Sequence, residues 1–120
     1  MADRKRHEQT CHDQSVRRRA AGLEAAGWYV RADLPEYAEK PPKLCVDGDC
    51  AIPDIYATYG KWTKIVEVET PDSYEKDRKQ HLIFRRWRDR HKNVEVNIPI
   101  CDVYSKRTMS EASISPETLC

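Results

Sequence analysis

The sequence predicts an α/β protein, a central mixed sheet flanked by helices, with its elements in the order α-β-β-β-α-β. Apolar residues recur at helical spacing in residues 13–27 and again in residues 72–91. Short stretches rich in β-branched and aromatic residues lie between these two segments, and one more follows the second. Because two adjacent strands precede the second helix and a further strand follows it, we expect both antiparallel and parallel pairing.

The first helix is expected over residues 13–27, because its apolar residues fall at i, i+4, i+7 and i+11. These residues are Val16, Ala20, Leu23 and Gly27. The glycine is a natural C-terminal stop. Residues 1–12 are expected to form a flexible basic arm.

Three strands are expected next. Residues 28–34, "WYVRADL", form the first, and three prolines with "DGD" make residues 35–50 a loop. "AIPDIYAT" at residues 51–58 is the second strand, and a tight turn at residues 59–61 follows it. "WTKIVEVET" at residues 62–70 is the third strand.

The second helix is expected to begin near Asp72 or Ser73, either of which can cap it, and to end at His91. "NVEVNIPI" at residues 93–100 is the fourth strand. We therefore expect one domain over residues 13–104, followed by a flexible polar tail over residues 105–120.

Composition limits the function classes. The 120 residues are 34% charged and 39% hydrophobic, with a net charge of +1. No apolar run approaches the ~20 residues of a membrane span, and the basic N-terminus is not followed by an apolar leader segment. We expect a cytoplasmic protein whose five irregularly spaced cysteines are reduced.

Acidic residues gather where the third strand ends. Side chains alternate along a strand, so Glu67 and Glu69 share a face roughly 7 Å apart. The tight turn pairs the second and third strands, which brings Asp54 close to Glu67. Such carboxylates repel one another, and Mg2+ or Mn2+ is the hard cation that suits oxygen ligands. The alternative is a solvated strand face without a metal.

Three helical residues are candidates for the same site. Glu24 could act as a fourth carboxylate, directly or through a metal-bound water. Lys76 and Gln80 share a face of the second helix and could contact a scissile phosphate or a water. Their simpler interpretations are a solvent-exposed Glu24, a Lys76 that extends to solvent and a hydrogen-bonded Gln80 at the rim.

These residues resemble the PD-(D/E)xK nuclease superfamily. Pro53-Asp54 is followed after twelve residues by Glu67-Val68-Glu69, and the resemblance covers about residues 13 to 100. Glu24 and Gln80 are similar to acids and glutamines of archaeal Holliday-junction resolvases and RecB-like nucleases. The resemblance implies a restriction-endonuclease-like core in which Asp54, Glu67 and the Val68 carbonyl bind magnesium.

One position departs from the motif, because Glu69 stands where the lysine is expected. Some restriction endonucleases of this superfamily also carry Glu there and are active. In others the lysine has moved to the following helix, which would make Lys76 its counterpart. A third alternative is an inactive site.

The expected function is metal-dependent hydrolysis of DNA phosphodiester bonds, on branched or flapped substrates among others. A homodimer is expected, because so small a domain reaches only one strand. Arginines would contact the DNA backbone, namely Arg17, Arg18, Arg19, Arg85 and Arg86. The alternative is a non-catalytic DNA-binding or assembly module that keeps the nuclease fold.

Two other signals are weaker. Cys45 and Cys50, with Cys11-His12 upstream, could bind zinc, although the spacing is not a standard one. A Cys45–Cys50 disulfide is another alternative, and Cys101 is most simply a core residue. No nucleotide-binding glycine motif or G-x-S-x-G is present, so the sequence gives no support for dinucleotide enzymes, P-loop motors or serine hydrolases.

Overall fold

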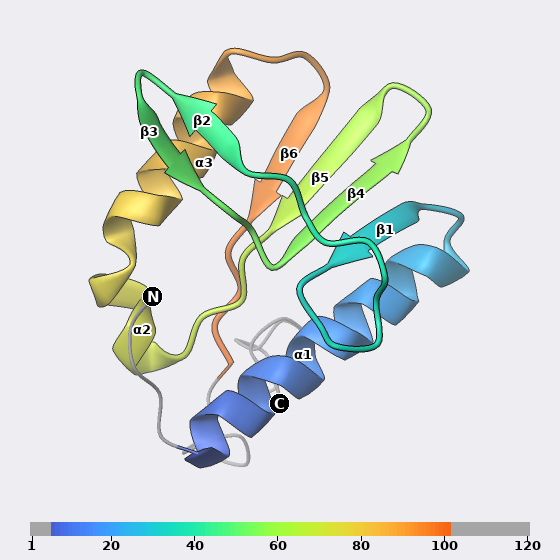
Figure 1. The fold of residues 1–120 in the computed structure, drawn as a ribbon, viewed down its shortest axis with the longest axis vertical. Coiled ribbons are helices and arrows are strands. Elements are labelled where there is room, and N and C mark those ends of the chain that lie inside the picture. Colours follow the sequence, from blue (N-terminus) through green and yellow to red (C-terminus); the bar gives the residue numbers. More distant parts are fainter. Residues whose placement is uncertain (1–5, 102–120) are drawn as a thin grey trace, which may run out of the picture.

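A computed structural model describes residues 6–101, with side chains from residue 9 onward. Four strands form one mixed sheet in the order β1-β4-β5-β6, and two short strands form a separate hairpin (Figure 1). The main sheet comprises β1 (Tyr29–Ala32), β4 (Ile55–Tyr59), β5 (Trp62–Val66) and β6 (Val94–Asn97). Pairing is antiparallel for β1 with β4 and for β4 with β5, and parallel for β5 with β6. The predicted mixed sheet flanked by helices is confirmed.

Helix α1 (Arg6–Ala25) packs against β1 and β4. Val16 and Ala20 are buried against Ile55 and Ala57 of the sheet. The helix therefore begins at Arg6, seven residues before the predicted start, and residues 6–12 are helical where a flexible arm was expected. Cys11 is buried in the same core and forms a disulfide with Cys101, so this first part of the helix is anchored to the protein.

The segment predicted as a loop contains the hairpin β2 (Leu44–Val46) and β3 (Asp49–Ala51). Its two turn residues, Asp47 and Gly48, both have positive φ, of 52° and 85°. Asp-Gly is a typical pair for this kind of tight turn. Three prolines precede the hairpin, and for this reason the sequence pattern predicted a loop.

The second predicted helix is two helices, α2 (Pro71–Lys76) and α3 (Arg78–Asp89), which meet at Asp77. Thr70 caps α2 through its side chain, so the predicted cap at Asp72 or Ser73 is wrong. Ile83 and Phe84 of α3 pack with Ile65 of β5 and with the β2–β3 hairpin. The sheet thus has α1 on one face, and α3 with the hairpin on the other (Figure 1).

Both cysteine pairs within the described residues are disulfides, Cys11–Cys101 and Cys45–Cys50. The prediction of reduced cysteines is therefore wrong for these four, and a zinc site formed by them is excluded. Cys101 is buried as predicted, but bonded to α1. Among residues 6–101, no helix combines the length and the apolar character needed to cross a membrane. The predicted tail at residues 105–120 lies outside the described part.

Candidate metal centre

The strand register places Asp54 beside Glu67. Ile55 is opposite Val66 in the antiparallel pair, so the residues one step further along lie next to each other. The Asp54 backbone N–H donates to Glu67 Oε1 at 3.1 Å. In return, the Val68 backbone N–H donates to Asp54 Oδ2 at 2.8 Å. The structure therefore brings together the aspartate and the glutamate that the sequence predicts to be close.

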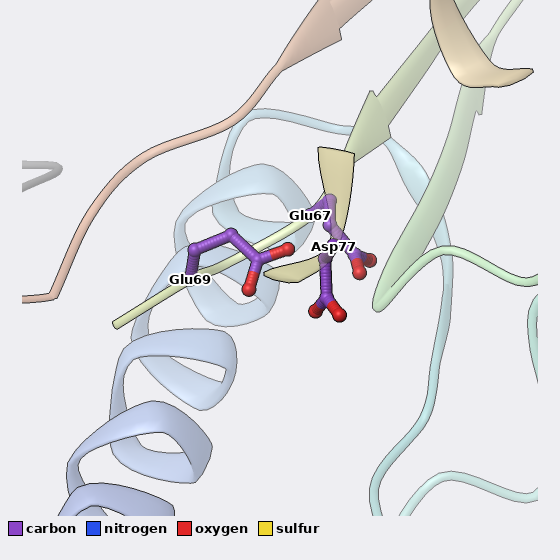
Figure 2. Close-up of side chains that lie close together, drawn as sticks. All are labelled: Glu67, Glu69 and Asp77. Carbon is purple, nitrogen blue, oxygen red and sulfur yellow. The ribbon is translucent and has the colours of Figure 1, made fainter. Parts of the chain in front are cut away.

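Glu69 joins this pair from beyond the end of β5, and Asp77 joins from the α2–α3 junction. Glu67, Glu69 and Asp77 each offer a carboxylate oxygen, and these three oxygens lie within 4.8 Å of one another (Figure 2). Their residues are only 1%, 0% and 5% exposed. This group, together with Asp54, is called the acidic cluster below.

Asp77 is a functional candidate that the sequence analysis missed. It is the N-cap residue of α3, yet its side chain accepts no capping hydrogen bond from the helix. Asp77 Oδ2 is instead buried without a hydrogen-bond partner within the described chain. Its spacing to His81 and Phe84, at i+4 and i+7, was a signal that Asp77 faces the interior.

The cluster strongly disfavours ionisation of Glu67. Burial raises the pKa of Glu67 well above its ordinary value, and the charges of Asp54 and Glu69 raise it further. The hydrogen bond from the Asp54 backbone lowers the pKa of Glu67, whereas the charge of Asp77 raises it slightly further. A cation among these oxygens would reverse the effect, because opposite charge favours the carboxylate form.

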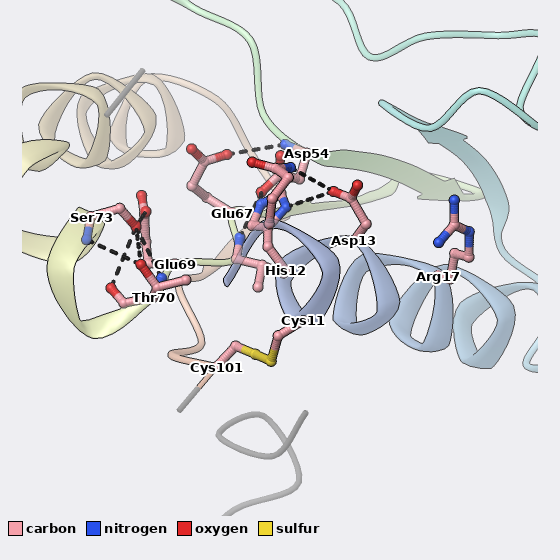
Figure 3. Close-up of polar contacts among 12 residues, drawn as sticks. Cys11, His12, Asp13, Arg17, Asp54, Glu67, Glu69, Thr70, Ser73 and Cys101 are labelled. Carbon is pink, nitrogen blue, oxygen red and sulfur yellow. Dashed lines mark hydrogen bonds and ion pairs between the residues drawn. A yellow bond between two sulfur atoms is a disulfide. The ribbon is translucent and has the colours of Figure 1, made fainter. Parts of the chain in front are cut away.

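His12 of α1 contacts the acidic cluster from the other side (Figure 3). Its Nε2 lies 3.1 Å from Asp54 Oδ2, and its Nδ1 lies 3.0 Å from Asp13 Oδ1. In the neutral imidazole one ring nitrogen carries the proton and donates to either Asp54 or Asp13, whereas an imidazolium would donate to both. The sequence analysis had considered His12 only as a zinc ligand with Cys11.

Glu69 is enclosed by two donors. His81 Nε2 lies 2.7 Å from Glu69 Oε2, and the Ser73 hydroxyl donates to Oε1. Ser73 also belongs to the capping box with Thr70, so the start of α2 fixes its position. Burial lowers the pKa of His81, and the charge of Arg85 lowers it further. Both Glu69 oxygens are thus already engaged.

Glu24 and Lys76 do not join the cluster. Glu24 is exposed and accepts a 2.8 Å hydrogen bond from the Tyr37 hydroxyl. It lies twelve residues from His12 on the same helix, or roughly 18 Å along the axis. Lys76 is exposed at the end of α2 and makes no hydrogen bond or ion pair with any described residue.

Two further predicted site residues, Gln80 and Val68, are half-buried and buried, respectively. Gln80 lies on α3, and its Oε1 is buried without a partner in the described residues. Val68 is fully buried between the two glutamates. Its N–H bonds to Asp54, whereas a role for its carbonyl as a ligand stays a prediction.

The predicted DNA-contacting arginines differ in their surroundings. Arg17 pairs with Glu36, and Arg86 pairs with Asp47. These two charges are already neutralised locally. Arg85 is half-buried and makes no ion pair with a described residue. Arg18 is exposed, and Arg19 is half-buried on α1.

The donor set of the acidic cluster fits a hard cation. Glu67, Glu69 and Asp77 offer carboxylate oxygens close to one another, and Asp77 Oδ2 has no hydrogen-bond partner among the described residues. Oxygen-only sites suit Mg2+, Mn2+ or Ca2+ rather than zinc. Comparison of the chain with protein-family models and with curated proteins gives no match. The resemblance to a nuclease superfamily therefore depends on the residues themselves.

Proposed function

We propose that this protein is a magnesium- or manganese-dependent DNA endonuclease. The observation that carries the proposal is Asp77, an N-cap aspartate whose carboxylate does not cap its helix and has a buried oxygen without a partner beside Glu67 and Glu69. Leaving a buried charged group unsatisfied costs free energy, about 1–3 kcal/mol or more. A bound cation would remove that cost.

The order of the elements supports the proposal. With the β2–β3 hairpin taken as an insertion, and α2 and α3 taken together, the order is α-β-β-β-α-β. Asp54 then precedes the second strand of the core, and Glu67 follows the third. This element order is the one that the resemblance to PD-(D/E)xK nucleases implies, and it supports our proposal of a restriction-endonuclease-like core.

Each part of the cluster has a chemical role in this proposal. Asp54, Glu67 and Asp77 would hold the cation, which would supply Lewis-acid stabilisation of charge on the phosphoryl oxygens. His12 orients Asp54, while Ser73 and His81 fix the Glu69 carboxylate. Because both oxygens of Glu69 accept hydrogen bonds, its role is to place negative charge beside the cation rather than to take a proton from water.

The second candidate is a non-catalytic module that binds DNA or assembles with other proteins. One observation favours it: Glu69 replaces the motif lysine, and Lys76 makes no described contact that would compensate. In that case the acidic cluster would bind a cation for stability alone. A homodimer remains part of either proposal, since one small domain contacts one DNA strand.

Cleavage of supercoiled plasmid, flap and four-way-junction DNA tests the nuclease proposal. We expect wild-type protein to cut in Mg2+ or Mn2+ but not in EDTA. Asp77→Asn and Glu67→Gln should each lower the rate about 100-fold or more, since lost metal contacts have effects at least this large. Glu39→Gln, a charge-matched change at an exposed loop residue, should cleave normally.

Two results would reject the nuclease. One is full activity in Asp77→Asn and Glu67→Gln. The other is a wild type that cuts none of these substrates in either ion. Salt-sensitive DNA binding without cleavage would then favour the module.

A further inference from the structure

A polar pocket of about 320 Å³ lies at the surface of α2 and α3, outside the acidic cluster. Its lining comes from these two helices alone, namely Tyr74, Glu75, Arg78, His81, Leu82 and Arg85. Two of the six side chains are guanidinium cations, and only one is a carboxylate. Apart from His81, which contacts Glu69, none of its lining residues has a role in the proposed metal chemistry.

The positive charge in the pocket is poorly compensated. Arg85 is half-buried and has no ion-pair or hydrogen-bond partner among the described residues. Arg78 lies 3.7 Å from Glu75, but both side chains are about three-quarters exposed, at 75% and 74%. Exposed pairs of this kind are weak because water screens them. The one carboxylate of the pocket, Glu75, therefore compensates Arg78 only weakly and leaves Arg85 without a paired anion.

His81 connects the pocket to the acidic cluster. Its ring lies 5.0 Å from the Tyr74 ring, and it contributes to the pocket wall. Through Nε2 it contacts Glu69 Oε2 at 2.7 Å. A group bound in the pocket would thus lie one side chain, that of His81, away from Glu69.

We propose that this pocket binds a phosphate group of the nucleic-acid strand adjacent to the scissile phosphate. The inference rests on the proposed function for its ligand. Guanidinium groups match phosphate oxygens with paired N–H donors. Arg78 and Arg85 are seven residues apart, so they lie on one side of α3 and can contact the same group. The volume admits a phosphate with its sugar, and Tyr74 and Leu82 provide apolar contacts.

Fluorescence anisotropy with a labelled single-stranded DNA 12-mer in EDTA tests the pocket without requiring cleavage. We expect Arg78→Ala and Arg85→Ala each to weaken binding about tenfold at low salt. The slope of the logarithm of the binding constant against the logarithm of the salt concentration should fall by about one for each variant. Arg88→Ala is the control, because Arg88 lies on the same helix, pairs with Asp89 and does not line the pocket.

A 5′-phosphorylated 12-mer and its 5′-hydroxyl counterpart distinguish the two sources of phosphate. If only the phosphorylated strand loses affinity in Arg85→Ala, the pocket binds a terminal phosphate. If both strands lose affinity equally in Arg85→Ala, the pocket binds a phosphate of the DNA backbone. Both results support a phosphate site in the pocket. A variant that loses DNA affinity together with the wild-type thermal shift in Mn2+ would count against it, because the loss would then follow from a changed fold.

The proposal is overturned if both arginine variants bind DNA as the wild type and Arg88→Ala do, or if the wild type does not bind. Failure of the nuclease proposal gives a different result, namely arginine-dependent binding in EDTA with no cleavage in Mg2+ or Mn2+. The two proposals can therefore fail separately.

Discussion

Glu67 is buried among carboxylates, and its protonation links the acidic cluster to the stability of the fold. Its pKa is raised above the ordinary value of 4.5, so the folded protein holds a proton that the unfolded chain releases. Stability from this group is therefore fully present below pH 4.5 and is lost as the pH rises toward the raised folded value. This sign is the reverse of that for a carboxylate held in an ion pair.

Glu67→Gln should stabilise the cation-free protein at neutral pH, because the amide keeps an oxygen for the Asp54 N–H and carries no charge. We expect a gain of about 1–3 kcal/mol in the free energy of unfolding in EDTA. The gain should vanish near pH 4. Urea unfolding at pH 4 and pH 8 measures it, and a loss of stability at pH 8 would contradict the assignment.

His81 and Glu69 form a buried pair whose members depend on each other. Replacing His81 by Leu leaves Glu69 Oε2 without its donor, and we expect a loss of about 1–3 kcal/mol. The double variant His81→Leu/Glu69→Leu should recover part of this loss, because no charge is then left unpaired. A double-mutant cycle by urea unfolding measures the coupling, and additive losses would show that the contact contributes nothing.

At the scale of elements, the sequence predicted strands and helices best where a local pattern matched the tertiary environment. The register of β4 and β5 followed from the short turn, and that register alone brought Asp54 to Glu67. The hairpin β2–β3 was missed because its strands are three residues each and lie between prolines. Its Asp-Gly turn was nevertheless visible in the sequence.

The acidic cluster was only partly predictable, because a local sequence pattern does not show which distant segments pack together. Glu67 and Glu69 are close in sequence, whereas Asp77 and His12 reach the site through helix packing. The break between α2 and α3 at Asp77 turns that carboxylate inward, and no residue pattern marked the break. Glu24 was expected because it flanks the apolar stripe, but the contact is made three turns earlier in α1, at His12.

The hairpin is held on α3 by Asp47, which pairs with Arg90 and Arg86. These hydrogen bonds lower the pKa of Asp47 to about 2, with Arg90 the larger cause. The resulting stability is present above the ordinary value of 3.8 and is lost as the pH falls toward 2. Asp47→Asn should therefore loosen the hairpin at pH 7, measured as faster amide exchange in β2 and β3. Unchanged exchange would mean that apolar packing alone holds the hairpin.

At the scale of the whole molecule, the Cys11–Cys101 disulfide joins the first part of α1 to the segment that follows β6. The linked residues are 90 apart in sequence, so the bond constrains almost all of the described chain. Cys11 also precedes His12, and Glu69 forms an isolated bridge with Ile100 next to Cys101. The bond thus ties together two segments that flank the acidic cluster.

Cys11→Ser/Cys101→Ser should be destabilised by roughly 4–5 kcal/mol, because closing a loop of this length removes much entropy from the unfolded chain. The matched control is Cys45→Ser/Cys50→Ser, which opens a loop with a separation of 5 residues and should cost roughly 2 kcal/mol. Urea unfolding of both variants under non-reducing conditions measures the difference. Equal losses would show that chain entropy does not govern the effect. A change in Mn2+ affinity confined to Cys11→Ser/Cys101→Ser would then indicate that the bond acts by positioning His12 beside Asp54.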